Sequence, residues 1–292
     1  MNPWTQLHDE FILDATTRNL SPNTVTYYRD CLKVFLEFVT TRSVARPQDV
    51  TSSHLRAYMG ACAETMSSGG VHARMRAVRA FYGFLKREDY LEKNPFDKVK
   101  LPKLPQEVQK NVTLEEFKVL SSVALLGTQP LRDTALLSLM FDTGIRASEL
   151  CGITLEDVLR DKGFILIRAA KGGKQRFVPI SRETLKKINR YILRERLECK
   201  VKTLFLTGRN EGLSYESLKS LLKRLFDRAE LTYKSPHCFR RGFAVQYVKN
   251  SGDVFTLQKI LGHATLTMSQ RYATLSSQDV LEIHRRASPV SF

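Results

Sequence analysis

Apolar residues recur at helical spacing through the first hundred residues, in four separate segments. Within each segment they stand three or four positions apart, which places them on one face of an α-helix. Short connections join the segments, and one of them, SPNT, has a proline where the first turn of a helix tolerates it. The pattern predicts a compact bundle of four helices. The four apolar faces are Trp4, Leu7, Phe11, Ile12 and Ala15; Val25, Tyr28, Leu32, Phe35 and Val39; Leu55, Tyr58, Met59 and Cys62; and Met75, Val78, Phe81, Tyr82 and Leu85.

A segment without regular periodicity follows the bundle. The stretch DKVKLPKLPQEVQKN contains two prolines and four lysines, a composition typical of a linker. A new helix is then expected to begin at Thr113, because Thr113 and Glu116 have the spacing of a capping box. We therefore expect two domains, residues 1–100 and residues 112–292, joined by a linker of residues 101–111.

The second domain is expected to be mostly helical, with a small antiparallel sheet. Two runs rich in β-branched and aromatic residues, 164–170 and 175–180, flank Gly172 and Gly173 and predict a hairpin. The run TLFLT at 203–207 is expected to add a third strand. Helices are expected at 131–140, 182–198, 215–229, 237–250, 254–261 and 265–272.

The charge of the chain restricts its partners. Lys and Arg number 46 against 30 Asp and Glu, which gives a formal net charge of +16. A field of that strength attracts polyanions, of which nucleic acid is the commonest and an anionic membrane surface the second. The alternative is a basic soluble protein without a polyanionic partner.

Several classes are excluded by what the sequence lacks. No apolar run approaches the roughly 18 residues of a membrane-spanning helix, and the first residues do not have the pattern of a signal peptide. The cysteines are odd in number, scattered and without a Cys-x-x-Cys pair, so neither a disulfide framework nor a zinc ribbon is expected. A reducing cytoplasm fits this composition. The five cysteines are Cys31, Cys62, Cys151, Cys199 and Cys238.

The fourth segment of the bundle also carries five cations. They form either a solvated charged face or a surface that follows a DNA phosphate backbone, where each cation would release condensed counterions. These candidate DNA-binding residues are Arg74, Arg76, Arg79, Lys86 and Arg87.

Several polar residues of the second domain have ordinary explanations when each is taken alone. His237 and Arg240 share a helix face, and so do Arg146 and Glu149, because each pair is three residues apart. A core histidine beside a surface arginine explains the first pair, and an intrahelical ion pair explains the second, so neither pair by itself indicates a functional site. Lys171 and Lys174 lie in the expected hairpin turn, His263 follows a glycine that suits a helix end, and Tyr272 lies in a short polar helix.

Together, in this order, these residues resemble the signature of the tyrosine recombinases, also called the phage integrase family. The resemblance extends over nearly the whole chain. It is carried by SPNTVTYYRDCLKVFLEFV, TGIRASEL, KGGKQRFVPI, PHCFRRGFA and LQKILGHATLTMSQRY. It implies that the helical first domain is a SAM-like core-binding domain, that the second is the catalytic domain, and that the two clamp duplex DNA.

The resemblance also implies a catalytic set, consisting of Arg146, Lys171, His237, Arg240, His263 and Tyr272. A phosphodiester repels nucleophiles by its own charge, so its cleavage needs positioning and charge neutralisation. Arg146 and Arg240 are expected to bind the non-bridging oxygens, with Glu149 orienting Arg146. Tyr272 is expected to attack the phosphorus, because a covalent intermediate preserves the bond energy.

The remaining roles are proton transfer and hydrogen bonding. His263 is expected to donate a hydrogen bond to the transition state. His237 is expected to accept the phenolic proton or to hold the phosphate. Lys171 is expected to protonate the leaving 5′ oxygen, with Lys174 as its competitor and a DNA contact. Arg241 departs from the family, where histidine is common at that position, and Cys238 is an unusual neighbour of His237.

The implied activity is site-specific recombination of double-stranded DNA, through a 3′-phosphotyrosine and a Holliday junction, without ATP, cofactor or metal. Because the first expected helix begins near Trp4, we expect a simple-site enzyme similar to the Xer recombinases or to the recombinases carried on mobile elements, namely transposons and integrative elements. The expected assembly is a homotetramer, or a heterotetramer with a related recombinase, with a tail at 276–286 docked on a neighbour. The alternatives are a type IB topoisomerase and a non-catalytic DNA-binding regulator. The expected location is the cytoplasm, at the nucleoid.

Overall fold

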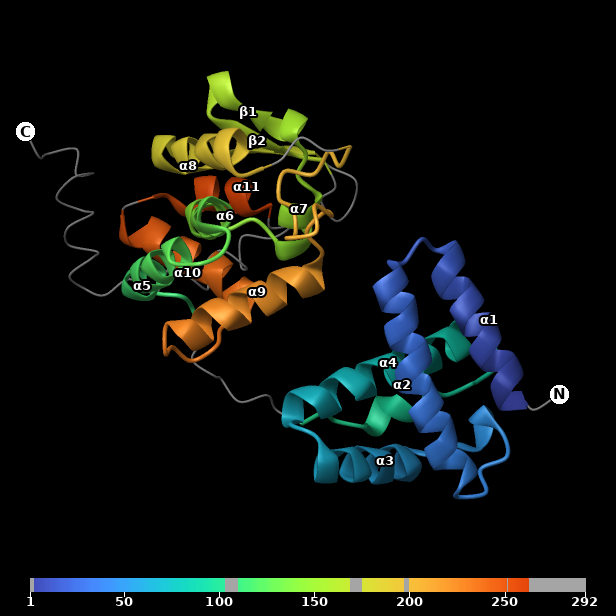
Figure 1. Cartoon of the computed structure of the whole chain (residues 1–292). Coiled ribbons are helices and arrows are strands. Elements are labelled where there is room, and N and C mark those ends of the chain that lie inside the picture. Colours follow the sequence, from blue (N-terminus) through green and yellow to red (C-terminus); the bar gives the residue numbers. More distant parts are fainter. Residues whose placement is uncertain (1–2, 103–109, 169–174, 197–199, 251, 263–292) are drawn as a thin grey trace, which may run out of the picture. The chain divides into compact units, whose positions relative to one another are not determined.

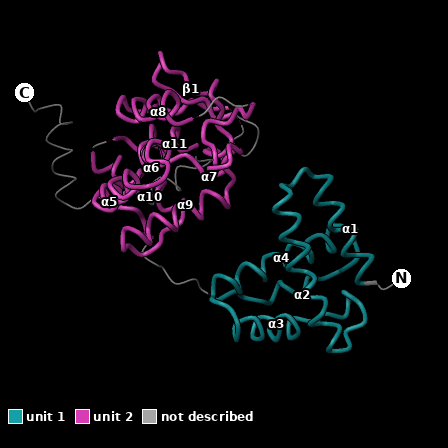
Figure 2. Tube along the Cα trace, in the orientation of Figure 1, with its two compact units in different colours: residues 1–107 teal, residues 108–292 magenta. Residues whose placement is uncertain are grey.

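The computed structural model describes residues 3–102, 110–168, 175–196, 200–250 and 252–262. The chain divides into two compact units, residues 1–107 and 108–292, which Figure 2 shows in different colours. Each unit has its own hydrophobic core.

Unit 1 is a bundle of four helices, as the sequence predicts. The helices are α1 (Pro3–Thr17), α2 (Pro22–Thr40), α3 (Ser52–Thr65) and α4 (Ser68–Arg87), with short 3₁₀ turns at Pro47–Asp49 and Pro95–Lys98 (Figure 1). The hydroxyls of Ser21 and Ser67 accept hydrogen bonds from backbone N–H groups in the first turns of α2 and α4, which satisfies donors that a helix end leaves unpaired. The buried centre is aromatic: Phe35 makes edge-to-face contacts with Trp4 and Tyr82.

Unit 2 is built around α6 (Pro130–Thr143), which packs against α5 (Leu114–Leu125), α8 (Arg182–Arg194) and α10 (Pro236–Lys249). Figure 1 shows α6 in the middle of these helices. Eleven of its fourteen residues are buried, because neighbours cover it on several sides. The unit also contains α7 (Ala147–Gly152), α9 (Tyr215–Arg228) and α11 (Val254–Leu261).

A three-stranded antiparallel sheet lies at one side of unit 2, in the order β1-β2-β3. The strands are β1 (Val158–Leu159), β2 (Phe164–Ile167) and β3 (Arg176–Pro179), and the last described pair before the hairpin turn is Ile167 opposite Arg176. The expected hairpin is therefore confirmed. The turn between these strands, residues 169–174, lies outside the described residues.

The expectation of a third strand at 203–207 is wrong. The third strand is β1, which has only two residues and so shows no alternation in the sequence. The 203–207 segment forms only single bridges, from Thr203 to Thr154 and from Leu206 to Gly212, and the chain bends at Leu204 and Phe205 between them. Leu204, Phe205 and Leu206 are all buried in the core. A buried irregular segment and a buried strand give the same apolar run, so the pattern does not distinguish them.

Two further differences concern helices. The helix expected at 182–198 ends at Arg194. Arg146 does not lie within a helix beside Glu149: it is the residue before α7, and Glu149 is in the first turn. The helix expected at 265–272 and the tail at 276–286 lie outside the described residues.

Candidate active site

Arg240 is a buried arginine on α10. Its side chain is almost inaccessible, with the whole residue 3 % exposed. One terminal nitrogen donates to the carbonyl of Gly144 and the other to the carbonyl of Leu261, both at 2.8 Å. The guanidinium therefore joins the end of α6 to the end of α11 and holds its positive charge at a fixed position.

The carbonyl that accepts from Arg240 belongs to Gly144, a position whose backbone and packing require glycine. It ends α6 in the left-handed region with φ of 58°, and a Cβ there would lie 2.5 Å from Cδ1 of Phe243. No other residue fits both the backbone angle and the packing. The turn after Gly144 delivers Arg146.

Arg146 and Glu149 form a close pair at the start of α7. A terminal nitrogen of Arg146 donates to Glu149 Oε1 at 2.8 Å, and the backbone N–H of Arg146 donates to Oε2 at 2.9 Å. The Arg146 side chain is 36 % exposed, whereas that of Glu149 is 3 % exposed. The pair with Glu149 fixes one edge of the Arg146 guanidinium, while the Arg146 side chain stays partly exposed to solvent.

Arg176 is a third arginine at this site, and the sequence analysis missed it. It begins β3, and its two terminal nitrogens donate to the two oxygens of Glu149, each at 2.8 Å. Burial alone would raise the pKa of Glu149, but the hydrogen bonds and charges of Arg176 and Arg146 outweigh it and lower that pKa to about 2. Glu149 is therefore a carboxylate at any physiological pH.

The three arginines meet at the carboxyl end of α11. Arg176 Nε donates to the carbonyl of Ile260 at 3.1 Å, Arg240 to Leu261 at 2.8 Å, and Arg146 to Gly262 at 3.2 Å. These carbonyls carry the negative end of the helix dipole, which cations stabilise. We call this group, Arg146, Arg176 and Arg240 on carbonyls 260–262, the arginine cluster.

His237 lies near the cluster, in the first turn of α10. Partial burial lowers the pKa of its imidazole, and the positive charges of Arg241, Arg240 and Arg146 lower it further. The ring is therefore neutral at pH 7, and a neutral imidazole has a nitrogen able to accept a proton.

Four of the predicted catalytic or DNA-binding residues, Lys171, Lys174, His263 and Tyr272, lie outside the described residues. The described residues that flank them are held in place by ion pairs and hydrogen bonds. Lys171 and Lys174 belong to the turn that begins after Arg168 and returns at Arg176. Arg168 pairs with the buried carboxylate of Asp157, so both ends of this hairpin are held by an arginine–carboxylate pair. His263 directly follows Gly262.

The cations of α4 have different environments. Arg79 donates to the Val99 carbonyl at 3.3 Å and lies over the ring of Phe96. Arg87 pairs with Asp14 at 2.8 Å and with Glu88 at 3.0 Å. These two arginines have partners within unit 1, and Arg74 lies beside Tyr58 and Cys31, whose pKa values its charge affects. The other two candidates, Arg76 and Lys86, are exposed.

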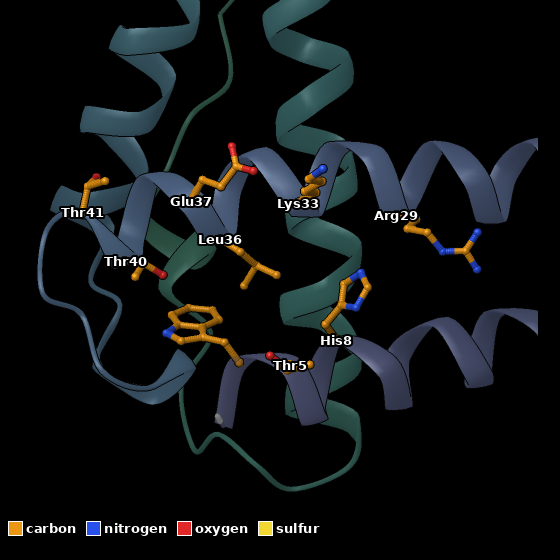
Figure 3. A pocket seen from close by; sticks show the side chains of 9 residues that line it. Thr5, His8, Arg29, Lys33, Leu36, Glu37, Thr40 and Thr41 are labelled. Atoms are coloured by element: carbon orange, nitrogen blue, oxygen red, sulfur yellow. The ribbon is translucent and has the colours of Figure 1, made fainter. Parts of the chain in front are cut away.

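Unit 1 also has a surface pocket of about 500 Å³ between α1 and α2. Figure 3 shows His8 of α1 pointing toward α2, where Arg29, Lys33 and Leu36 lie, and Trp4 also lines the pocket. This pocket belongs to unit 1, whereas the arginine cluster belongs entirely to unit 2.

The search for other kinds of site gives two findings. Among the described residues, no group of three or more His, Cys, Asp or Glu side chains is arranged to hold a metal ion. Within the same ranges, no helix has both the length and the apolar character that crossing a membrane requires.

Comparison with known proteins places this chain in a family. Residues 110–279 match the phage integrase family, and residues 10–89 match the N-terminal SAM-like domain of phage integrases. The chain belongs to the phage integrase family. It is a site-specific tyrosine recombinase, and the comparisons do not favour the topoisomerase or the non-catalytic regulator.

The relatives cover the recombinase almost completely. Tyrosine recombinase XerC of Oceanobacillus iheyensis is 33 % identical, over 93 % of this chain and 92 % of its own length. Tyrosine recombinase XerD of Bifidobacterium longum is 29 % identical, over 99 % and 98 %. Among solved structures, XerA recombinase is 26 % identical with a TM-score of 0.55, over 98 % of this chain and 99 % of that one. The Tn1549 transposon integrase in complex with transposon right end DNA has the same fold, with 20 % identity and a TM-score of 0.81 over 99 % and 100 %.

Proposed function

We propose that this recombinase cuts and rejoins double-stranded DNA at specific sites, with Tyr272 as the nucleophile and with Arg146 and Arg240 of the arginine cluster as the seat of the scissile phosphate. The observation that carries the proposal is the convergence of Arg146 and Arg240 on adjacent carbonyls of α11, with His237 nearby. Two guanidiniums that are held in place before the substrate arrives neutralise a phosphorane without reorganisation, which is how electrostatic catalysis works best.

The chemistry would proceed by two transfers. The phenolic oxygen of Tyr272 attacks phosphorus, the bond to the 5′ oxygen breaks, and a 3′-phosphotyrosine and a 5′ hydroxyl result. The 5′ hydroxyl of the partner duplex then attacks that phosphorus and releases the phenol. Two such rounds pass through a Holliday junction. Each step exchanges one phosphoester for another of similar energy, so ATP is not needed.

The described residues supply most of the electrostatics. Arg146, held by Glu149 and partly exposed, would bind a non-bridging oxygen. Arg240 would supply a second, buried positive charge. Neutral His237 would accept the proton of Tyr272, because the lowered pKa of its imidazole keeps the ring in the form that has a free acceptor nitrogen.

The roles of His263 and of the general-acid lysine rest on the resemblance alone. His263 would donate a hydrogen bond to the phosphate; it directly follows Gly262, whose carbonyl binds Arg146. Lys171 would protonate the 5′ oxygen, with Lys174 as its competitor. Both lysines lie in the hairpin turn between Arg168 and Arg176.

DNA binding would involve both domains, taken as residues 1–100 and 112–292 with a linker at 101–111. In the first, exposed Arg76 and Lys86 of α4 are the best candidates for phosphate contacts. We further propose a homotetramer, or a heterotetramer with a related recombinase, on two DNA sites, with the tail at 276–286 docked on a neighbour. A solved lambda integrase structure is a tetramer bound to a Holliday junction. The enzyme would act in the cytoplasm, at the nucleoid, without a metal or cofactor.

The decisive experiment is covalent trapping. Wild-type protein is incubated with randomised duplexes, covalent adducts are recovered and sequenced, and the recovered site is remade with a nick next to the cut. We call this the suicide duplex. Wild type should form an adduct on it, and Tyr272→Phe should not. Absence of an adduct with wild type would overturn the proposal. Relaxation of a supercoiled plasmid without the site would indicate a topoisomerase, and full function of Tyr272→Phe would indicate a non-catalytic protein.

A further inference from the structure

Arg176 is the member of the arginine cluster to which no role has been assigned. Its side chain is 12 % exposed, and each of its three nitrogens donates a hydrogen bond. Two reach the oxygens of Glu149 at 2.8 Å, and the third reaches the carbonyl of Ile260 at 3.1 Å. The guanidinium therefore faces inward, toward other parts of the protein.

The three contacts join three segments that are distant in sequence. Arg176 itself is the first residue of β3, where the hairpin that contains Lys171 returns to the sheet. Glu149 lies in the first turn of α7 and orients Arg146. Ile260 lies at the end of α11, from which the chain continues to His263 and Tyr272.

The side chain of Arg176 is also closely packed against the end of α11. A Cβ added at Gly262 would lie 3.2 Å from both Cδ and Nε of Arg176. Gly262 has φ of 64°, so glycine is favoured there by its backbone as well. The arginine stem therefore lies directly against the glycine that precedes His263.

We propose that Arg176 is a positioning residue for the phosphoryl-transfer step. It fixes the base of the lysine hairpin, the carboxylate that orients Arg146, and the end of α11 in one arrangement. The inference rests on the proposed function, because it assumes that these segments carry the catalytic groups. Arginine is required for the geometry: its planar fork binds both carboxylate oxygens while Nε binds a third acceptor, which a lysine ammonium on a flexible stem does not reproduce.

The test separates cleavage from binding. Arg176→Gln is compared with wild type in single-turnover cleavage of the suicide duplex, in affinity for the uncut duplex, and in thermal unfolding. We expect cleavage to slow by about 10²-fold, the usual effect of a misplacement of about 1 Å, with affinity changed by less than about threefold. Lys186→Gln is the matched control, because it removes the same charge from an exposed pair with Glu183 on α8. It should cleave at the wild-type rate.

A conservative variant covers the case in which Arg176→Gln fails to fold. Arg176→Lys keeps the charge beside Glu149 and should fold, yet cleave about 10-fold more slowly than wild type, because one ammonium does not replace three directed donors. The inference is overturned if Arg176→Lys cleaves at the wild-type rate. It is also overturned if each variant loses cleavage, DNA affinity and thermal stability in equal proportion, because a purely structural role gives that pattern. Failure of wild type to form an adduct would overturn the proposed function instead.

Discussion

The carboxylate of Glu149 faces the guanidinium of Arg176 as a two-pronged ion pair, with both nitrogen–oxygen distances at 2.8 Å. The same carboxylate binds the side chain and the backbone N–H of Arg146. One buried negative charge thus orients two cations of the candidate active site. Removing it would leave both guanidiniums without their carboxylate, which is far more costly than losing an exposed pair.

The first prediction concerns the stability of the fold in acid. The pKa of Glu149 is about 2 in the folded protein and 4.5 ordinarily. A lowered pKa stabilises the fold fully above about pH 4.5, and this stabilisation is lost as the pH falls toward 2. The shift corresponds to about 3 kcal/mol. The free energy of unfolding, measured by urea titration between pH 7 and pH 3, should fall less in Glu149→Gln than in wild type. In the exposed pair variant Glu183→Gln the fall should stay close to that of wild type, because solvent screens the pair of Glu183 with Lys186.

The second prediction concerns the pH dependence of cleavage. The pKa of His237 is lowered by burial and by the charges of Arg241, Arg240 and Arg146. A general base acts in its neutral form, so the cleavage rate should fall only as the pH drops below this lowered pKa, with a midpoint below about 6.5. Single-turnover cleavage of the suicide duplex across pH 5–8 measures it. His237→Gln should lack this acid limb, and His8→Gln, in unit 1, should keep it. A midpoint above 6.5 would contradict the assignment.

The third prediction concerns the segment that enters unit 2. The backbone N–H of Val112 donates to the carbonyl of Cys238 on α10 at 3.0 Å. A Cβ at Gly242 would lie 2.2 Å from the carbonyl oxygen of Val112. Gly242→Ala should therefore push this segment away from α10 and lower the free energy of unfolding by about 2–3 kcal/mol, the usual cost of overpacking. Gly152→Ala is the control, because nothing lies within 4 Å of its added Cβ. Equal stability of the two variants would refute the close approach.

The fourth prediction separates the cations of α4 by function. Arg76→Gln and Lys86→Gln should each weaken DNA binding uniformly and reduce the slope of log affinity against log salt by about 1, as the loss of a phosphate contact does. Arg79→Gln should leave that slope unchanged and lower the free energy of unfolding by about 1 kcal/mol, because Arg79 holds the Val99 carbonyl. A salt titration of DNA binding, paired with thermal unfolding, distinguishes the two groups.

The sequence predicted the helices well because their apolar faces repeat over several turns. The stripe from Met75 to Leu85 is buried in α4, as its spacing indicates. Short elements were less predictable. The two residues of β1 are too few to show a period, and the buried run Leu204–Leu206 resembles a strand in composition. In both places tertiary contacts decide the structure.

The members of the candidate site could be proposed residue by residue but not as a network. Arg146, Arg240 and His237 were proposed from their motifs, yet nothing in a motif states that three arginines bind successive carbonyls at the end of one helix. Arg176 had a signal that was not used. In a strand it shares a face with Val178, which is buried, and an arginine on the inward face of a strand needs a buried partner. Only the fold identifies that partner as Glu149.

The anchoring of the end of α11 limits how far the phenol of Tyr272 can reach. The arginine cluster fixes the chain up to Gly262, and Tyr272 follows ten residues later. A fully extended chain of that length covers about 35 Å, so the Cα of Tyr272 can reach no farther than that from the Cα of Gly262. The phosphate that the phenol attacks, in its own subunit or a neighbour's, has to lie within that reach extended by the tyrosine side chain, which sets an upper bound on the spacing of subunits that share active sites.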